Sequence, residues 1–251
     1  MADSDHRSGY ELSAPFYDFF DRKQNIEFFL RHALVACRVL DVGAGTGRIA
    51  IPLARQGVTV QCVEPSPGMR RVFRRKLGEE PELRERIRLT AGTARTFRCG
   101  RSFPACIMSG TFDHFLDHEE RGASLRNIAR HLDVGGVLVF DVFLGLMESS
   151  PLKPAGEAIV EGRRVRRLVG GRLLPGRQKE THLVFEVYEG DRLVDRVEEI
   201  SLVGLVDRQE VHTVLSGTGF EVLAEWSAYD RTPYRGGDPL LILEVVRRAG
   251  G

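Results

Sequence analysis

The sequence predicts an α/β fold in which helices cover a mostly parallel sheet. From Arg38 onward, short apolar runs alternate with helical patterns, which is typical of such sheets. Three glycines at alternate positions, 43–47, separate the first apolar run from the first helical pattern, where a tight strand-to-helix turn is expected. With 251 residues, the chain can bury a sizeable core in one large domain or two small ones.

The expected elements follow from these patterns in chain order. The apolar run 38–43 reads as a buried strand, and helix 48–56 follows the glycines. Pro65 and Pro67 mark the turn from the second strand into the second helix. The remaining strands of this half are expected over 58–64, 87–91, 105–109 and 137–143, with helices over 67–77 and about 119–131. Near the end, a helix over 208–216 stops at Gly217, and strands follow over 221–228 and 240–247.

Between about 157 and 203 the chain alternates apolar and polar residues. Segment 181–188 runs into Gly190-Asp191, which predicts a strand entering a hairpin. We therefore expect an antiparallel β insertion over 151–205, serving as a substrate lid or a dimer surface. The main domain is expected over 37–150 and 206–251, and a helical cap with several aromatic residues over 1–36.

Composition excludes several classes of protein. The charges of the 36 basic and 35 acidic side chains nearly cancel, which argues against a protein whose main task is to bind the phosphate backbone of a nucleic acid. No apolar run is long enough to span a bilayer, and no signal peptide opens the sequence, so we expect a cytoplasmic protein without a membrane partner. The four cysteines show no metal-ligand spacing, and we expect no metal.

The glycine segment has an acidic residue on either side in the expected fold. Asp41 ends the first strand just before Gly43, and Glu64 ends the second strand 23 residues later, where a carboxylate can accept ribose hydroxyls. The spacing is GxGxG rather than the GxGxxG of dinucleotide-binding enzymes, and a carboxylate beside the loop would repel a pyrophosphate. The pattern favours a ligand with a cationic group, the alternative being a turn without a ligand.

These residues resemble the class I S-adenosylmethionine-dependent methyltransferases. The resemblance lies in DVGAGTG at 41–47, VEPS at 63–66, and the segments 109–116 and 132–141, and covers roughly residues 38–143. It implies a Rossmann-like, seven-stranded sheet whose last strand runs antiparallel. Within the class, the chain looks like small-molecule enzymes such as sugar-amine and glycine N-methyltransferases, which also carry an antiparallel insertion after the fifth strand.

The resemblance implies S-adenosylmethionine as cofactor, S-adenosylhomocysteine as product, and no metal. The residues expected at the cofactor are Asp41, Gly43, Ala44, Gly45, Gly47, Glu64, Pro65, Met69, Thr93, Ala94, Ser109 and Phe112. One departure stands out. The class often has a Gly-Asp pair after the third strand to bind the adenine amino group, but this chain has Gly92-Thr93-Ala94. Thr93 or the backbone of Ala94 must then supply that contact.

Candidates for the chemistry at the acceptor lie after the fourth strand and on the cap. His114 is a candidate general base, or a structural histidine. Asp113 orients an amine or caps a helix, and Tyr17 bonds the cofactor carboxylate or lines the substrate pocket. Further substrate-binding candidates are Tyr10, Tyr229, Arg231 and Tyr234. Arg231 binds a carboxylate or extends to water.

We therefore expect methyl transfer to a nitrogen or oxygen of a small molecule, and we expect that molecule to be a secondary metabolite. The enzyme is expected to be a monomer or homodimer that binds no nucleic acid. Three alternatives remain open at this point. A methyltransferase acting on RNA or protein would use the arginine clusters near 70–76 and 163–167. A nicotinamide-dependent oxidoreductase and a non-catalytic binding module are the other two.

Overall fold

The computed structural model describes residues 10–20, 24–145 and 148–249. Seven strands form the main sheet, in the order β10-β11-β5-β4-β1-β2-β3. Their bounds are β1 Arg38–Val42, β2 Thr59–Glu64, β3 Ile87–Ala91, β4 Phe103–Met108, β5 Leu132–Phe143, β10 Phe220–Trp226 and β11 Leu240–Arg247. The last strand, β11, is antiparallel to both of its neighbours, whereas β1 to β5 pair in parallel. The predicted fold class is confirmed.

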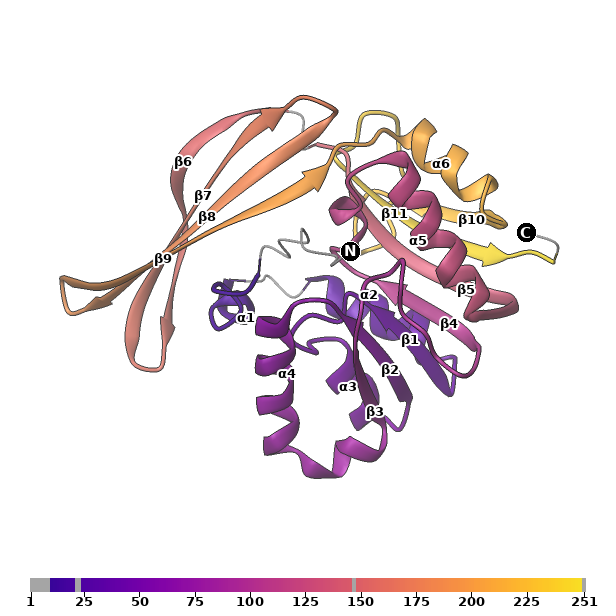
Figure 1. Ribbon diagram of the computed structural model, residues 1–251, viewed down its shortest axis with the longest axis horizontal. Coiled ribbons are helices and arrows are strands. Elements are labelled where there is room, and N and C mark those ends of the chain that lie inside the picture. The colour runs from indigo at the N-terminus through magenta and orange to yellow at the C-terminus, as the bar shows by residue number, and fades with distance from the viewer. Residues whose placement is uncertain (1–9, 21–23, 146–147, 250–251) are drawn as a thin grey trace, which may run out of the picture.

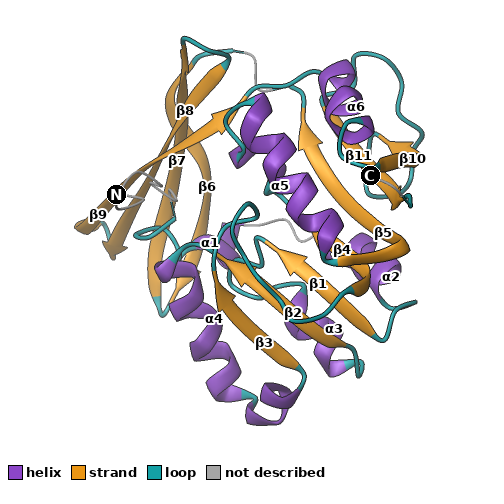
Figure 2. Cartoon of the chain, turned by 45° about the vertical axis from the view of Figure 1, so that its right-hand side comes forward, coloured by secondary structure: helices purple, strands orange, loops and turns teal. Residues whose placement is uncertain are grey.

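Helices cover both faces of this sheet. The helical elements are α1 Tyr17–Phe20, α2 Gln24–Ala33, α3 Ala50–Arg55, α4 Pro67–Glu79, α5 His118–Arg130 and α6 Arg208–Ser216, with 3₁₀ turns η1 Pro81–Glu85 and η2 Phe112–His114. One core cluster joins α5 and α6 to the sheet, and a second joins α2, α3 and α4 to it. Figure 2 shows α5 and α6 beside each other over one face. None of the helices in the described ranges is long and apolar enough to cross a membrane.

Helix starts follow the capping rules. The Ser66 hydroxyl accepts the Met69 amide at 3.1 Å, and Pro67 occupies the first turn of α4. The carboxylates of Asp117 and Asp207 accept the Glu120 and Glu210 amides in the same way at α5 and α6. Each of these three helices therefore begins at a residue whose side chain satisfies a free backbone amide.

The antiparallel insertion follows β5. Its strands are β6 Ser150–Val160, β7 Arg163–Leu174, β8 Gln178–Glu189 and β9 Arg192–Gly204, in that order in a separate sheet. Figure 1 shows this sheet at the side of the main domain, with α1 between it and α4. The ring of Phe16 stacks on that of Phe185 in β8, with centroids 4.9 Å apart. The insertion is thus packed against the N-terminal segment through aromatic side chains.

One element bound differs clearly from expectation. The strand β5 begins at Leu132 rather than Val137. Gly135, which has φ +80°, precedes the strand expected over 137–143. It instead lies inside β5, where the pairing with β4 shifts register, because a glycine lets a strand continue through an irregularity.

Candidate functional site

A cavity of about 480 Å³ lies at the carboxyl ends of β1, β2, β3 and β4. This is the edge at which open α/β sheets bind ligands. The sheet edge and α4 supply one part of its lining, including Gly43, Gly45, Glu64, Pro65, Met69, Thr93, Ala94 and Ser109. Tyr10 and Tyr17 come from the N-terminal segment, His114 from η2, Glu120 and Ser124 from α5, and Leu202 from β9.

The glycine loop is folded back onto the end of β2. The amides of Gly43 and Ala44 both donate to the carbonyl of Val63, at 2.8 and 3.1 Å. Gly43 has φ +75°, and a Cβ atom built on it would lie 2.1 Å from Thr111 Oγ1. A Cβ on Gly45 would meet only one backbone oxygen, at 4.0 Å, so this residue presents its main chain to the cavity.

Glu64 is buried, and its carboxylate is held by main-chain donors. Oε2 accepts the Gly45 amide and Oε1 accepts the Ser66 amide, each at 2.8 Å. Desolvation raises the pKa of Glu64, and the two amides partly oppose that effect. Since each carboxylate oxygen has a second acceptor site, Glu64 can still receive two hydroxyl donors from a ligand.

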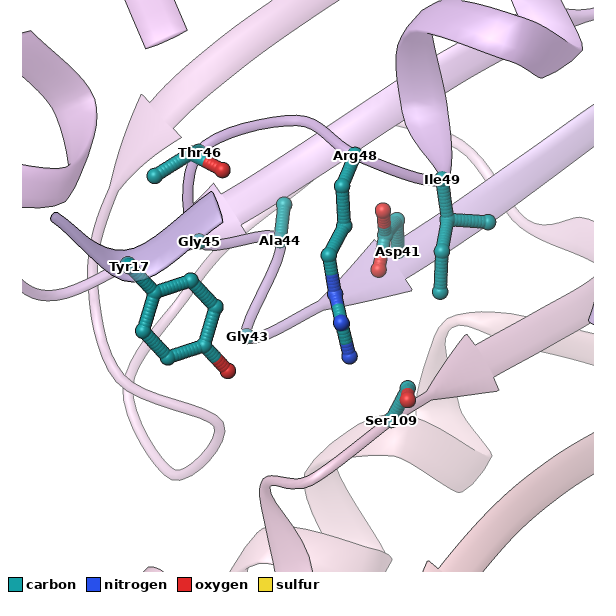
Figure 3. Close-up of a pocket in the computed structure, with 9 residues that line it drawn as sticks. All are labelled: Tyr17, Asp41, Gly43, Ala44, Gly45, Thr46, Arg48, Ile49 and Ser109. Carbon is teal, nitrogen blue, oxygen red and sulfur yellow. The ribbon is translucent and has the colours of Figure 1, made fainter. Parts of the chain in front are cut away.

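A small polar pocket of about 20 Å³ adjoins the glycine loop. Figure 3 shows the Arg48 side chain between the Tyr17 ring and Asp41, with Ser109 beyond it. The guanidinium carbon of Arg48 lies 5.7 Å from the Tyr17 ring centroid. Burial, with a contribution from Glu64, raises the pKa of Asp41 to about 7. Asp41 and Arg48 thus line the same small pocket beside the loop.

A hydrogen-bond network fixes the end of β4 next to this pocket. Asp141 in β5 is fully buried and accepts the Gly110 amide at 2.5 Å and the Tyr229 hydroxyl at 2.8 Å. Ser109 Oγ donates to Asp141 at 3.3 Å and accepts from Asn25 Nδ2 at 2.8 Å. The network joins α2, β4 and β5, so the backbone at 109–110 is rigidly placed.

Tyr10 and His114 meet inside the cavity. The Tyr10 hydroxyl lies 3.1 Å from His114 Nε2, and His114 Nδ1 lies 3.3 Å from the carbonyl oxygen of Leu202. A carbonyl only accepts, which assigns the imidazole proton to Nδ1 and leaves Nε2 to accept from Tyr10. Desolvation lowers the pKa of His114 below 6.5, so the ring is neutral at neutral pH.

Most of the residues predicted at the cofactor line one of these two spaces. Asp41 and Ala44 line the small pocket rather than the large cavity. Gly47, with φ +81°, lines neither, and a Cβ on it would lie 2.3 Å from the Phe73 ring. Phe112 is fully buried against Phe140. Gly47 and Phe112 thus make packing contacts and line neither of the two spaces.

Three residues that were predicted to act in catalysis or substrate binding, Asp113, Tyr229 and Arg231, do not line the cavity. Asp113 is buried outside it and accepts the Phe143 amide at 3.3 Å, and burial beside Asp141 raises its pKa to about 8. Tyr229 packs on Phe28 and bonds Asp141. Arg231 lies exposed over the Trp226 ring at 5.9 Å.

Tyr234 lines a separate cavity of about 670 Å³ between α6 and β10. The chain after β10 folds back on that strand through a bridge between Trp226 and Pro233. Arg231 and Tyr234 therefore lie outside the lining of the cavity that contains His114, which corrects the expectation that they face the same site.

Several side chains of the two basic clusters are engaged within the chain. Arg70 donates to the carbonyl of Glu64 at 2.7 Å, and Lys76 pairs with Asp18 at 2.5 Å. In the insertion, Arg166 pairs with Glu186 at 2.5 Å and Arg163 with Glu189 at 3.1 Å. Paired cations bind phosphate backbones poorly, so these clusters lend little support to a nucleic-acid substrate.

Several lining residues were not predicted from the sequence: Arg48, Thr111, Leu116, Glu120, Ser124 and Leu202. Arg48 directly follows the glycine loop, and that position was a usable signal. Leu202 comes from the insertion and has no local signal. No group of three or more His, Cys, Asp or Glu side chains suited to a metal comes together within the described ranges.

Known proteins resemble this chain at two levels. Residues 39–136 match a family described as a methyltransferase domain. Uncharacterized methyltransferases from Bacillus thuringiensis and Bacillus cereus are 30% identical over 102 residues, which is 41% of this chain and 45% of theirs. The match therefore spans less than half the length of these curated relatives.

Solved structures extend the resemblance to nearly the whole chain. The CcbJ methyltransferase from Streptomyces caelestis has a TM-score of 0.81 at 19% identity, covering 98% of this chain and 100% of that one. A sugar N-methyltransferase from Streptoalloteichus has a TM-score of 0.75 at 24% identity, covering 99% and 97%. An S-adenosylmethionine-dependent methyltransferase from Clostridium acetobutylicum has 0.78 at 15%, covering 93% and 95%. At these identities the likeness shows the fold.

Proposed function

Because the chain carries a methyltransferase domain over residues 39–136 on the class I fold, we propose that it transfers a methyl group from S-adenosylmethionine to a nitrogen or oxygen atom of a small molecule. The observation that carries this proposal is the cavity in which the glycine loop and Glu64 meet. Its volume of about 480 Å³ is in the range of small-ligand sites.

The donor set suits this cofactor. Glu64 offers fixed acceptors for the two ribose hydroxyls, and the main chain at Gly45 is open to a ligand. Asp41 and Arg48, which line the same small pocket beside the loop, match the ammonium and carboxylate of an amino-acid end. Thr93 and Ala94 lie at another part of the lining and would face the base. When bound, the cofactor supplies a methyl group already activated on sulfur.

The chain's own residues position the acceptor and keep water away. Tyr10 and Tyr17 of the N-terminal segment line the cavity, and their rings favour a site from which water is excluded. The Tyr10 hydroxyl, bonded to neutral His114, can accept a proton from the acceptor while its own proton passes to Nε2. Holding the reacting atoms in line supplies most of the remaining rate enhancement.

A small acceptor is favoured over RNA or protein. The cavity is lined by α5 and β9 as well as by the sheet edge, and several side chains of the basic clusters are paired with carboxylates. The shared fold with a sugar N-methyltransferase supports an amine on a metabolite scaffold, and we extend the proposal to a role in natural-product biosynthesis.

Transfer of label from methyl-labelled S-adenosylmethionine tests the proposal. Panels of small amines and small alcohols would be incubated with the protein, and labelled products would be detected by mass spectrometry. We expect label on at least one small acceptor and none on RNA or protein. Label appearing only on a macromolecule would overturn the small-molecule assignment.

His114→Asn is expected to lower kcat roughly 100-fold, because it removes the proton acceptor behind Tyr10. In the wild type, kcat/KM is expected to fall with acid only below pH 6.5, since the pKa of His114 is lowered and protonation blocks Nε2. His118→Asn, on the exposed start of α5, is the control. Full activity and an unaltered pH profile in His114→Asn would assign that histidine a purely structural role.

A further inference from the structure

Residues 10–20, here called the N-terminal strap, form one wall of the cavity through two of their side chains. Tyr10 and Tyr17 of the strap line the cavity, and their rings meet edge to face with centroids 5.7 Å apart. With Ala14 they pack on Met69 and Val72 of α4. A ligand that fills the cavity would therefore contact the strap.

Glu199 in β9 fastens the strap to the insertion. One carboxylate oxygen accepts the amides of Glu11 and Leu12, at 2.6 and 3.1 Å, and the other accepts the amide of Ser13 at 2.9 Å. The Glu199 side chain is 9% exposed. Three consecutive main-chain donors on one buried carboxylate make a strong, charge-assisted attachment.

The strap is also fastened to the cofactor side of the cavity. The Glu11 carboxylate accepts Ser66 Oγ at 2.9 Å and the Gly68 amide at 2.7 Å, at the start of α4 and just after Glu64. At the other end, Asp18 accepts Thr46 Oγ1 from the glycine loop at 2.6 Å. These contacts join the strap directly to the segments proposed to hold the cofactor.

In its attached position the strap thus contacts both the insertion, through Glu199, and the segments on the cofactor side of the cavity. Tyr10 and Tyr17 line the cavity while the strap is attached, so a bound ligand would contact both rings and loosening of the strap would remove these contacts. The hydrogen bonds of the strap to α4 and to the glycine loop are made to the main domain. The attachment at Glu199 instead makes the closed strap depend on β9, which also presents Leu202 to His114.

We propose that Glu199 is a positioning residue that clamps the N-terminal strap closed and thereby sets the residence time of the cofactor. The proposal rests on the function proposed above, since it concerns the same cavity. The contacts of Glu11 and Asp18 remain when Glu199 is replaced, so the closed geometry stays accessible and its lifetime shortens.

The test compares Glu199→Gln with the wild type and with Glu198→Gln. Glutamine keeps the size but removes the charge, and its amino group would face a main-chain donor. Glu198 is exposed in the same strand and pairs with His182 at 3.2 Å, which makes it a matched control. Stopped-flow measurement of S-adenosylhomocysteine release is expected to show dissociation about tenfold faster in Glu199→Gln. KM for the cofactor should rise, with kcat at saturation within about threefold of the wild type.

Glu199→Asp should show an intermediate rate, because the charge is kept on a shorter side chain. An unchanged rate of S-adenosylhomocysteine release in both Glu199 variants, or an equally faster release in Glu198→Gln, would overturn the clamp. The proposed function would still stand in either case if the wild-type protein binds the cofactor. Hydrogen exchange on the wild-type protein is a second measurement that needs no variant. The amides of residues 11–13 should gain protection when cofactor binds, and fast exchange at saturating cofactor would also overturn the proposal.

Discussion

Gly43→Ala is expected to abolish measurable binding of S-adenosylmethionine, with an increase in Kd of at least about 100-fold. The new Cβ atom would lie 2.1 Å from Thr111 Oγ1 and 2.7 Å from its Cγ2, so the loop or the chain after β4 must move. The residue also has φ +75°, which costs a non-glycine residue about 1–2 kcal/mol. Both effects displace the main chain that faces the cavity, and isothermal titration calorimetry measures the result.

Gly57→Ala separates strain from steric overlap. Gly57 has φ +89°, but a Cβ atom there would meet nothing within 4 Å, and the residue lies in the turn before β2, at the opposite end of that strand from the cavity. This control should lower the unfolding free energy by about 1 kcal/mol and leave cofactor binding unchanged. Equal affinity in Gly43→Ala and the wild type would show that the glycine loop does not contact the cofactor.

Glu64→Gln is expected to weaken S-adenosylmethionine binding about 100-fold. The substitution removes the charge that would accept the ribose hydroxyls, and hydrogen bonds to a charged group contribute about 1.5–3 kcal/mol each. It also places an amino group against the Gly45 or Ser66 amide, which disturbs the loop itself.

The comparison variant is Glu79→Gln, at the exposed end of α4. It should bind as the wild type does, and circular dichroism would show whether both variants remain folded. A folded Glu64→Gln protein with wild-type affinity would remove Glu64 from the proposed cofactor site.

The cofactor side of the site could be anticipated because its signals are local. Asp41, Gly43 and Glu64 each stand at the end of a strand, and the carboxyl ends of neighbouring parallel strands meet at one edge. The positive φ at Gly43 and Gly45 is also a property of the turn itself. Sequence spacing therefore carried enough information to place these residues together.

The acceptor side could not be anticipated in the same way. Tyr229, Arg231 and Tyr234 follow a strand that ends near the site, but the chain then reverses, and only tertiary packing fixes that path. Leu202 and Glu199 reach the cavity and the strap from a separate sheet, and Leu202 lies 88 residues beyond His114. No periodicity within β9 distinguishes these two from its other residues.

His114 shows where sequence and structure complement each other. Its position after β4 predicted a place at the sheet edge, but not its partners. The structure adds Tyr10 on Nε2 and the Leu202 carbonyl on Nδ1, which fix the orientation of the ring and assign its neutral tautomer. The proposal of a proton acceptor thus depends on three segments far apart in the chain.

Calorimetric titration of the folded wild-type protein with S-adenosylmethionine tests the central claim most directly. We predict saturable binding at a single site, with Kd in roughly the micromolar range, and comparable binding of S-adenosylhomocysteine. The absence of saturable binding of either compound up to about 1 mM, by protein shown to be folded, would contradict the assignment of the cavity as a cofactor site.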